Sequence, residues 1–458
     1  MFWGGFLQQK KFKNLRFLLI LVLIISLCIV TVTATVTTGN IFKNTENKGF
    51  SIEIFTDSAF KERQRYEING KIGEEVLCNY LSRAVTISPE VAPLDVIKTP
   101  YIKSFILNTG AKYIQRAATC WNPDINDFLT HDEQKEFIDD LHKSDPDVIF
   151  EACVFECVST KVNEIPIPEW VFQDFGLTPE NRNFSFQDMC FSDGLYLNHW
   201  GEGTTVPDIT KLESRMFLYY RACSYINSGF EALHMGQVHL MGSRDTNWVN
   251  WTELLKMIRV YAAKNARRNY VLINSHTHGI VGSDGVLLFD FHAYPSRPMA
   301  DTSQEPHKPT EDNPQRASFD PYHCDSIYGK SLGGKTYSGW TTDSLPYLVE
   351  LDNYGDDESS LNVPYSWDMR CWGMDEITWF ANQPRSYREE FLNYAYTWVK
   401  DTAEGNGFMA LPGERVARYY NNTDGNIYSW RYYAYNPDNF YAGNGDEQII
   451  KEIFEKNK

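Results

Sequence analysis

Acidic side chains stand at the ends of two β-type runs in the sequence. Glu156 ends the apolar run 147–157, and Glu350 and Asp352 end the run 345–353. Period-two alternation places Glu350 and Asp352 on one face of a strand. An ionisable side chain that points into a barrel is costly unless it is paired or used in a reaction. These positions are therefore candidates for acid–base or nucleophilic chemistry.

Two carboxyl groups from different strands that face one cavity could hydrolyse a glycosidic bond. One group stays protonated and donates to the leaving oxygen, while the other is ionised and acts as nucleophile or as base toward water. Under this hypothesis Glu350 is the nucleophile or base, Asp352 is its close alternate and Glu156 is the acid. Glu231 is a further candidate, although its position early in the run 229–238 favours the floor of a barrel.

Aromatic and polar residues near the same strand ends could bind a sugar. Phe, Trp and Tyr make up 15% of the chain, and their faces are surfaces on which sugar rings can stack. A large aromatic core would account for the composition equally well. The predicted substrate-binding residues are Trp121, Gln237, His276, His278, Trp340, Asn353 and Trp379.

A second interpretation centres on histidine. His276 and His278 lie two residues apart at the end of the run 270–278, and such a pair can bind one metal ion. Asp290 and His292 follow on the next run. A metal-dependent hydrolase centred on His276 and His278 therefore stays open, as does a surface protein that binds without turnover. The preferred scheme uses neither a metal nor a cofactor.

The elements that must position these residues alternate between short β-type runs and helical segments from 111 to 413. That pattern predicts a parallel sheet covered by helices, which we expect to close into a (β/α)8 TIM-like barrel with long loop insertions. Four helices are clear, over 130–143, 209–226, 251–268 and 387–400. The candidate strands are 112–121, 147–157, 229–238, 270–278, 286–292, 345–353, 376–383 and 407–411. Residues 37–110 are expected to form a lead-in, and residues 414–458 an aromatic extension that ends in a short charged helix.

The N-terminus predicts export. Four basic residues precede the apolar segment Phe17 to Val36, which has the character of a signal peptide or a membrane-spanning helix. Residues 1–36 would then be a cytoplasmic stub with a signal anchor or signal peptide, and we favour a retained anchor. The remainder would be an extracellular or lumenal domain of a single-pass membrane protein, or a secreted protein after cleavage.

Cysteines and glycosylation sequons agree with export. Eight cysteines follow the apolar segment, an even number that is compatible with up to four disulfides. Acceptor sequons occur at Asn183, Asn250 and Asn421. The chain after the apolar segment has 39 basic and 60 acidic residues, a net charge of −21. That balance argues against nucleic acid or an anionic membrane surface as the main partner.

Strands that end in Glu, Asp, His and Trp, with Trp-rich loops, resemble the barrel catalytic domains of glycoside hydrolases. The resemblance covers about residues 100 to 415 and implies a carbohydrate or glycan substrate. It is architectural and points to no particular family. The Asn-Glu pair that ends the fourth strand in many of those enzymes is missing from the fourth candidate strand, 270–278.

Overall fold

The structure is a computed structural model, which describes residues 65–87, 100–129, 131–301, 303, 309–323, 326–352, 375–404, 406–421, 426–435 and 443–457. The apolar segment Phe17 to Val36 and Asn353 lie outside these residues. Among the residues described, no helix is both long and apolar enough to span a membrane.

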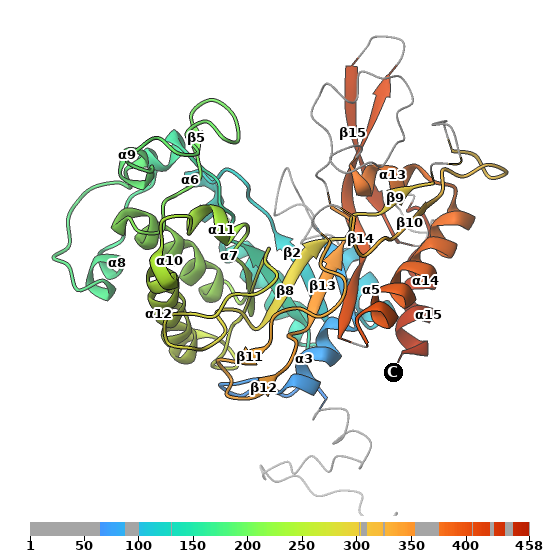
Figure 1. Ribbon diagram of the computed structural model, residues 1–458, viewed down its shortest axis with the longest axis horizontal. Helices are drawn as coiled ribbons and strands as arrows, with labels where there is room; N and C mark the ends of the chain where they lie inside the picture. The colour runs from blue at the N-terminus through green and yellow to red at the C-terminus, as the bar shows by residue number, and fades with distance from the viewer. Residues whose placement is uncertain are drawn as a thin grey trace, which may run out of the picture. The chain divides into compact units, whose positions relative to one another are not determined.

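Eight parallel strands form a closed barrel (Figure 1). Each pairs in parallel with the next, and the circle closes where the first strand pairs with the last. In order around the barrel they are β1 (Ala84–Ile87), β2 (Tyr113–Ala118), β3 (Ile149–Cys153), β6 (Ala232–His234), β7 (Leu272–Ser275), β8 (Phe291–Pro295), β13 (Tyr347–Glu350) and β14 (Gly407–Asn421). The predicted eight-stranded barrel is confirmed.

Three of the predicted elements differ from the structure, and one of them is the strand predicted over 286–292, which overlaps β8 only at Phe291 and His292. The first barrel strand, β1, lies in the segment 37–110, which was expected to be a lead-in. It was not predicted because a run of four residues is too short to show a period. The predicted strand 376–383 is instead the helix α13 (Glu376–Asn382). Its β-branched and aromatic residues suggested a strand, but Asp375 caps the helix by accepting from the Thr378 backbone N–H at 2.8 Å. Pro384 then favours the extended backbone in which the helix ends.

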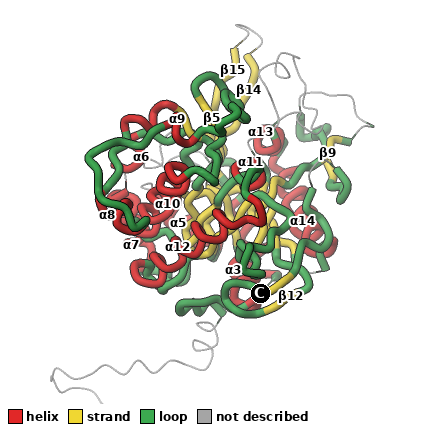
Figure 2. Tube along the Cα trace, turned by 60° about the vertical axis from the view of Figure 1, so that its left-hand side comes forward, coloured by secondary structure: helices red, strands yellow, loops and turns green. Residues whose placement is uncertain are grey.

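Helices surround the barrel, with α10 and α12 on one side and α14 and α15 on the other (Figures 1 and 2). All four predicted helices are present. The helices are α3 (Glu74–Leu81), α5 (Pro100–Thr109), α6 (Ile125–Leu129), α7 (His131–His142), α8 (Glu169–Asp174), α9 (Phe186–Met189), α10 (Leu212–Asn227), α11 (Val238–Met241), α12 (Val249–Asn265), α13, α14 (Arg385–Thr402) and α15 (Glu447–Lys456).

Short strands lie in the connections. They are β4 (Val158–Ser159), β5 (Thr204–Thr205), β9 (Met299–Ala300), β10 (Ala317–Ser318), β11 (Gly334–Lys335) and β12 (Thr341–Thr342). The long strand β14 continues past the barrel and pairs antiparallel with β15 (Asn426–Tyr433), and this hairpin projects at the top of Figure 1. The predicted aromatic extension 414–458 therefore contributes to a barrel strand, a hairpin and the final helix α15.

Strand alternation separates two apolar cores. Outward side chains such as Ile114, Phe150 and Val349 pack in the core beneath the helices. Inward side chains such as Ile149 and Leu348 fill the barrel together with α3, which covers the N-terminal ends of the strands. Polar side chains follow the inward apolar ones toward the C-terminal ends of the strands, which we call the barrel mouth. The residues that define the mouth are Glu151, His234, Asn274 and Glu350, all buried.

The described cysteines form no disulfide, so the expectation of disulfides is wrong for this part of the chain. Cys78, Cys120, Cys153, Cys157, Cys190 and Cys223 are free thiols. Cys324 and Cys371 lie outside the described residues.

The sequons differ in their surroundings. Asn183 is exposed, whereas the side-chain amide of Asn250 donates to Asp245 at 2.8 Å and accepts from Arg215 at 2.6 Å. Asn421 ends β14. Glycosylation at the three sites stays a prediction.

Candidate active site

Glu151 is the deepest acidic residue of the mouth. Its carboxyl accepts hydrogen bonds from the Tyr113 hydroxyl at 2.6 Å, from Asn274 Nδ2 at 2.6 Å and from the Arg116 backbone N–H at 3.1 Å. Burial raises the pKa of Glu151 to about 7, and the hydrogen bonds from Tyr113 and Asn274 limit the rise. Glu151 is thus a fully bonded group beneath the mouth.

Arg116 lies at an irregularity of β2, where the register with β3 shifts between Ile114 and Ala118. Its φ of 58° is in the left-handed region, which is rare for a residue with a side chain. The Arg116 guanidinium donates from Nε to Glu350 Oε1 and lies 3.6 Å from Asp352 Oδ1. Backbone strain of this kind persists only where the surroundings hold it, and it is concentrated at functional sites.

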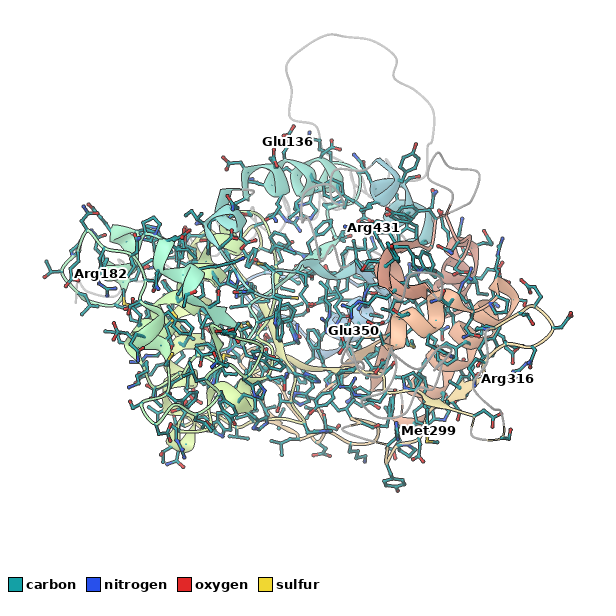
Figure 3. All side chains as sticks on the ribbon, turned by 90° about the horizontal axis from the view of Figure 1, so that it is seen from above. Glu136, Arg182, Met299, Arg316, Glu350 and Arg431 are labelled. Atoms are coloured by element: carbon teal, nitrogen blue, oxygen red, sulfur yellow. The ribbon has the colours of Figure 1, made fainter. Side chains whose placement is uncertain are left out.

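Glu350 is held between two arginines. In addition to Arg116, Arg415 lies 3.3 Å from Glu350 Oε2 and also donates to the Leu351 carbonyl at 2.7 Å. Burial raises the pKa of Glu350, and the charges of Arg116 and Arg415 act against that rise. Figure 3, which looks onto the end with the β14–β15 hairpin, shows Glu350 near the middle of the view.

Asp352 is more accessible than Glu350. Its side chain is 13% exposed, against 2% for Glu350. Burial would raise the pKa of Asp352, but the positive charges of Arg116, Arg297 and other cations outweigh it, so the pKa is lowered. Asp352 is therefore ionised at neutral pH.

Glu376, the first residue of α13, holds the chain beside Asp352. Its carboxylate accepts from the Asp352 backbone N–H at 3.1 Å, from Arg297 Nη1 at 2.9 Å and from Ser296 Oγ at 3.0 Å. Arg297 also lies 4.0 Å from Asp352 Oδ2. The helix α13, missed by the sequence prediction, thus fixes the end of β13.

Glu156 and Gln237 form a paired unit on the other side of the mouth. Glu156 accepts from the Gln237 backbone N–H at 2.9 Å and from its side-chain Nε2 at 2.8 Å. The preceding Gly236 has a φ of 68°, and a Cβ there would lie 2.0 Å from Glu156 Oε2. Burial raises the pKa of Glu156, with the Gln237 hydrogen bonds acting against the rise. Because β3 stands four strands from β13 in either direction, Glu156 follows the strand opposite the one that Asp352 follows.

His234 and Asn274 link the acidic groups. Asn274 uses its Nδ2 for Glu151, so its Oδ1 accepts from His234 Nδ1 at 2.7 Å. Burial, aided by the Arg116 charge, lowers the pKa of His234 to about 3. His234 is therefore neutral, with its proton on Nδ1.

The predicted histidine pair contacts an aromatic ring. The rings of His276 and His278 lie 4.2 and 4.7 Å from the Tyr294 ring. Over the described residues, no cluster of three or more His, Cys, Asp or Glu side chains could hold a metal ion.

Three predicted site residues lie away from the mouth. Glu231 precedes β6 at the N-terminal end of the barrel, paired with Arg267 at 2.5 Å and Arg268 at 2.7 Å. Trp340 donates to the Ile72 carbonyl at 3.1 Å and packs against the core with α3. Trp379 is buried on the helix α13, whereas the sequence prediction placed it near the end of a strand that the structure does not contain. We therefore withdraw these three from the site.

Trp121 does lie at the mouth, where its ring contacts Phe155 and Trp200. The sequence prediction missed five further residues that form the mouth or contact it. They are Arg116, Glu151, His234, Asn274 and Arg415. Period-two alternation from Ile149 would have pointed Glu151 inward, but the two arginines carried no comparable signal.

No protein-family model and no curated protein matches the sequence. Among solved structures, the chain is similar to the debranching enzyme of Nostoc punctiforme soaked with acarbose, at 10% identity and a TM-score of 0.35, over 85% of this chain and 82% of that one. It is similar to the type III pullulan hydrolase from Thermococcus kodakarensis at 18% identity and a TM-score of 0.26, over 46% and 39%. It is also similar to the glycoside hydrolase domain of PelA from Pseudomonas aeruginosa at 10% identity and a TM-score of 0.25, over 52% and 74%. The chain spans 53% of the native-form debranching enzyme, so assigning a function depends on the residues at the mouth.

Proposed function

We propose that this chain is a glycosidase-like hydrolase that cleaves a glycosidic bond at the barrel mouth. The observation that supports the proposal is that Asp352 and Glu156 follow opposite strands, β13 and β3, at the C-terminal end of a closed parallel barrel. Barrels of this kind build their active sites at that end. Glycoside hydrolysis needs one ionised and one protonated carboxyl group across the bond.

Asp352 fits the ionised role. Its pKa is lowered by surrounding cations and its side chain is partly exposed, so a substrate can reach it. It would either bond to the anomeric carbon or take a proton from the water that attacks that carbon. Glu350, the first choice from the sequence, is engaged by both Arg116 and Arg415, which leaves it as a positioning residue.

Glu156 fits the role of proton donor. Burial raises its pKa, and Gln237 fixes the orientation of its carboxyl group. As the glycosidic C–O bond breaks, Glu156 would transfer its proton to the leaving oxygen. A group whose pKa is raised toward the working pH is suited to this transfer.

The substrate class and the compartment extend this proposal. The acidic chain, with a net charge of −17, suits a neutral carbohydrate better than an anionic one. Export through the N-terminal apolar segment, with an anchor or a cleaved signal, would place the barrel among extracellular or lumenal glycans. Both statements depend on the sequence alone.

The test is hydrolysis of neutral oligosaccharides and of aryl glycosides, measured as released reducing ends or released phenol. We expect Asp352→Asn to abolish turnover of both substrate types. Glu156→Gln should abolish turnover of oligosaccharides but retain much of it with an aryl glycoside, whose acidic phenol leaves without a proton. Wild-type activity in Asp352→Asn, or equal losses for Glu156→Gln on both substrates, would contradict the assigned roles.

A further inference from the structure

A chain of aromatic rings leads from the mouth toward the surface. The Phe155 ring, just after β3, lies 5.8 Å from the His234 ring and 5.8 Å from the Arg116 guanidinium. The Trp121 ring lies 5.1 Å from Phe155 and 4.9 Å from Trp200. We call Trp121, Phe155 and Trp200 the aromatic wall. Its first ring, Phe155, lies next to Arg116, which contacts Glu350 and Asp352.

Trp121 exposes an apolar ring that is held in place. It is 38% exposed, whereas Phe155 is buried. The Trp200 ring meets it at 81° and the Phe155 ring at 57°, so neighbours brace it from two directions. A braced ring loses little side-chain entropy when a ligand packs on it. A single exposed aromatic is common, but one that is continuous with a cluster of carboxylates is a candidate binding surface.

Two ion pairs lie in the segments next to the wall, and the exposed Glu202 follows Trp200 by two residues. Lys161 pairs with Asp124 at 3.3 Å in the loop that follows Trp121. Arg244 pairs with Asp193 at 2.7 Å in the segment that leads to Trp200. A ligand seated on the wall would therefore meet apolar faces, two compensated ion pairs and the carboxylate of Glu202, which suits a molecule with an apolar face and no negative charge.

We propose that the aromatic wall binds one sugar ring of a neutral oligosaccharide, stacked on Trp121, with the adjoining part of the chain leading into the mouth. The inference rests on the proposed function and adds to it the position of one sugar ring of the substrate. Stacking on Trp121 would select for rings with an apolar face, and the nearby carboxylate of Glu202 would disfavour negatively charged sugars.

The test measures binding by the full-length chain with isothermal titration calorimetry. The probes are maltohexaose, cellohexaose and mannohexaose, with hexagalacturonate as the charged comparison. For a neutral probe that binds the wild type, we expect Trp121→Ala to weaken affinity roughly tenfold or more, about 1.4 kcal/mol, and Trp121→Phe to weaken it less. Tyr337→Ala is the matched control, since Tyr337 is 41% exposed and also packs on neighbouring side chains, and it should leave affinity unchanged.

Three results would overturn the inference. They are unchanged affinity in Trp121→Ala, equal weakening in Tyr337→Ala, and tighter binding of hexagalacturonate than of every neutral probe. Absence of binding by all three neutral probes would also count against it. The proposed function is tested separately, because a wild type that binds but does not hydrolyse would refute the hydrolase and leave the binding site standing. Hydrolysis that is unaffected by Trp121→Ala would refute the binding site on the aromatic wall and leave the proposed hydrolase standing.

Discussion

Arg116 joins Glu151 to Glu350 across the barrel. Its backbone N–H donates to Glu151 at 3.1 Å on β3, and its guanidinium contacts Glu350 on β13, the strand directly opposite. One residue on β2 thereby ties together two walls that share no hydrogen bond in the sheet. Arg116 makes both contacts from a left-handed backbone conformation.

Replacing Arg116 with Ala should lower both stability and turnover. Glu350 would keep Arg415 but lose one of two cations, and leaving a buried charge undercompensated costs about 3–5 kcal/mol. Loss of the nearby cation should also raise the pKa of Asp352, so the acidic limb of the kcat/KM profile should move to higher pH. Urea unfolding and a pH–rate profile measure the two effects.

Arg244→Ala is the control, because the Arg244–Asp193 pair is exposed and an exposed ion pair contributes little to stability. A stable Arg116→Ala variant whose acidic limb is unmoved would show that Arg116 does not act on Asp352.

The pH dependence of stability should reflect Glu151. Burial raises its pKa from 4.5 to about 7 in the folded chain, so the folded state binds a proton more tightly than the unfolded state. Its contribution is fully present below about pH 4.5 and is lost as the pH rises through about 7. The free energy of unfolding should therefore fall between pH 5 and pH 8, with roughly 3 kcal/mol of that fall coming from Glu151.

Glu151→Gln should flatten this fall by its share, measured by urea unfolding at the two pH values. Asp375, Glu376 and Glu414, whose pKa values burial also raises to about 7, should preserve part of the slope. Glu136→Gln, on the exposed surface of α7, should leave the slope as in the wild type (Figure 3). A Glu151→Gln slope equal to that of the wild type would contradict the shift.

Gly236 should tolerate no side chain. A Cβ there would lie 2.0 Å from Glu156 Oε2, and the φ of 68° adds backbone strain. Gly236→Ala should therefore destabilise the chain by more than about 2 kcal/mol and displace Glu156. Gly285→Ala shares the positive φ, at 77°, but meets no atom within 4 Å, so it should cost only about 1–2 kcal/mol. Equal losses of unfolding free energy in the two variants would show that contact with Glu156 is unimportant.

The barrel was predictable because alternation and length are local properties. The runs that contain Ile149–Cys153 and Leu272–Ser275 are short and bounded, and each follows a periodic helix, α7 and α12. The strand β1 was not predicted because Ala84–Ile87 has too few residues to show a period. The prediction of a strand over 376–383 was wrong because Asp375 caps a helix there. The β-branched and aromatic composition of the segment does not reveal that cap.

The site was predictable only in part. The position of a residue on a strand follows from the local sequence pattern, but its ion-pair and hydrogen-bond partners do not. Glu350, Asp352 and Glu156 could be placed at strand ends from alternation alone. The partners that decide their chemistry lie far away in sequence, as Arg116 does from Glu350, and only the closed barrel brings them together. Trp340 and Trp379 looked equivalent to Trp121 in sequence. In the structure Trp340 packs against the core with α3, and Trp379 is a buried residue of α13.

The most direct test of the account compares kcat/KM for oligosaccharide hydrolysis in Asp352→Asn and in Glu231→Gln. Both variants remove one carboxylate from the barrel, but Glu231 lies at the opposite end, bound by Arg267 and Arg268. We predict a loss of at least about 1,000-fold for Asp352→Asn and less than about threefold for folded Glu231→Gln. Comparable activity in the two variants would contradict an active site at the mouth.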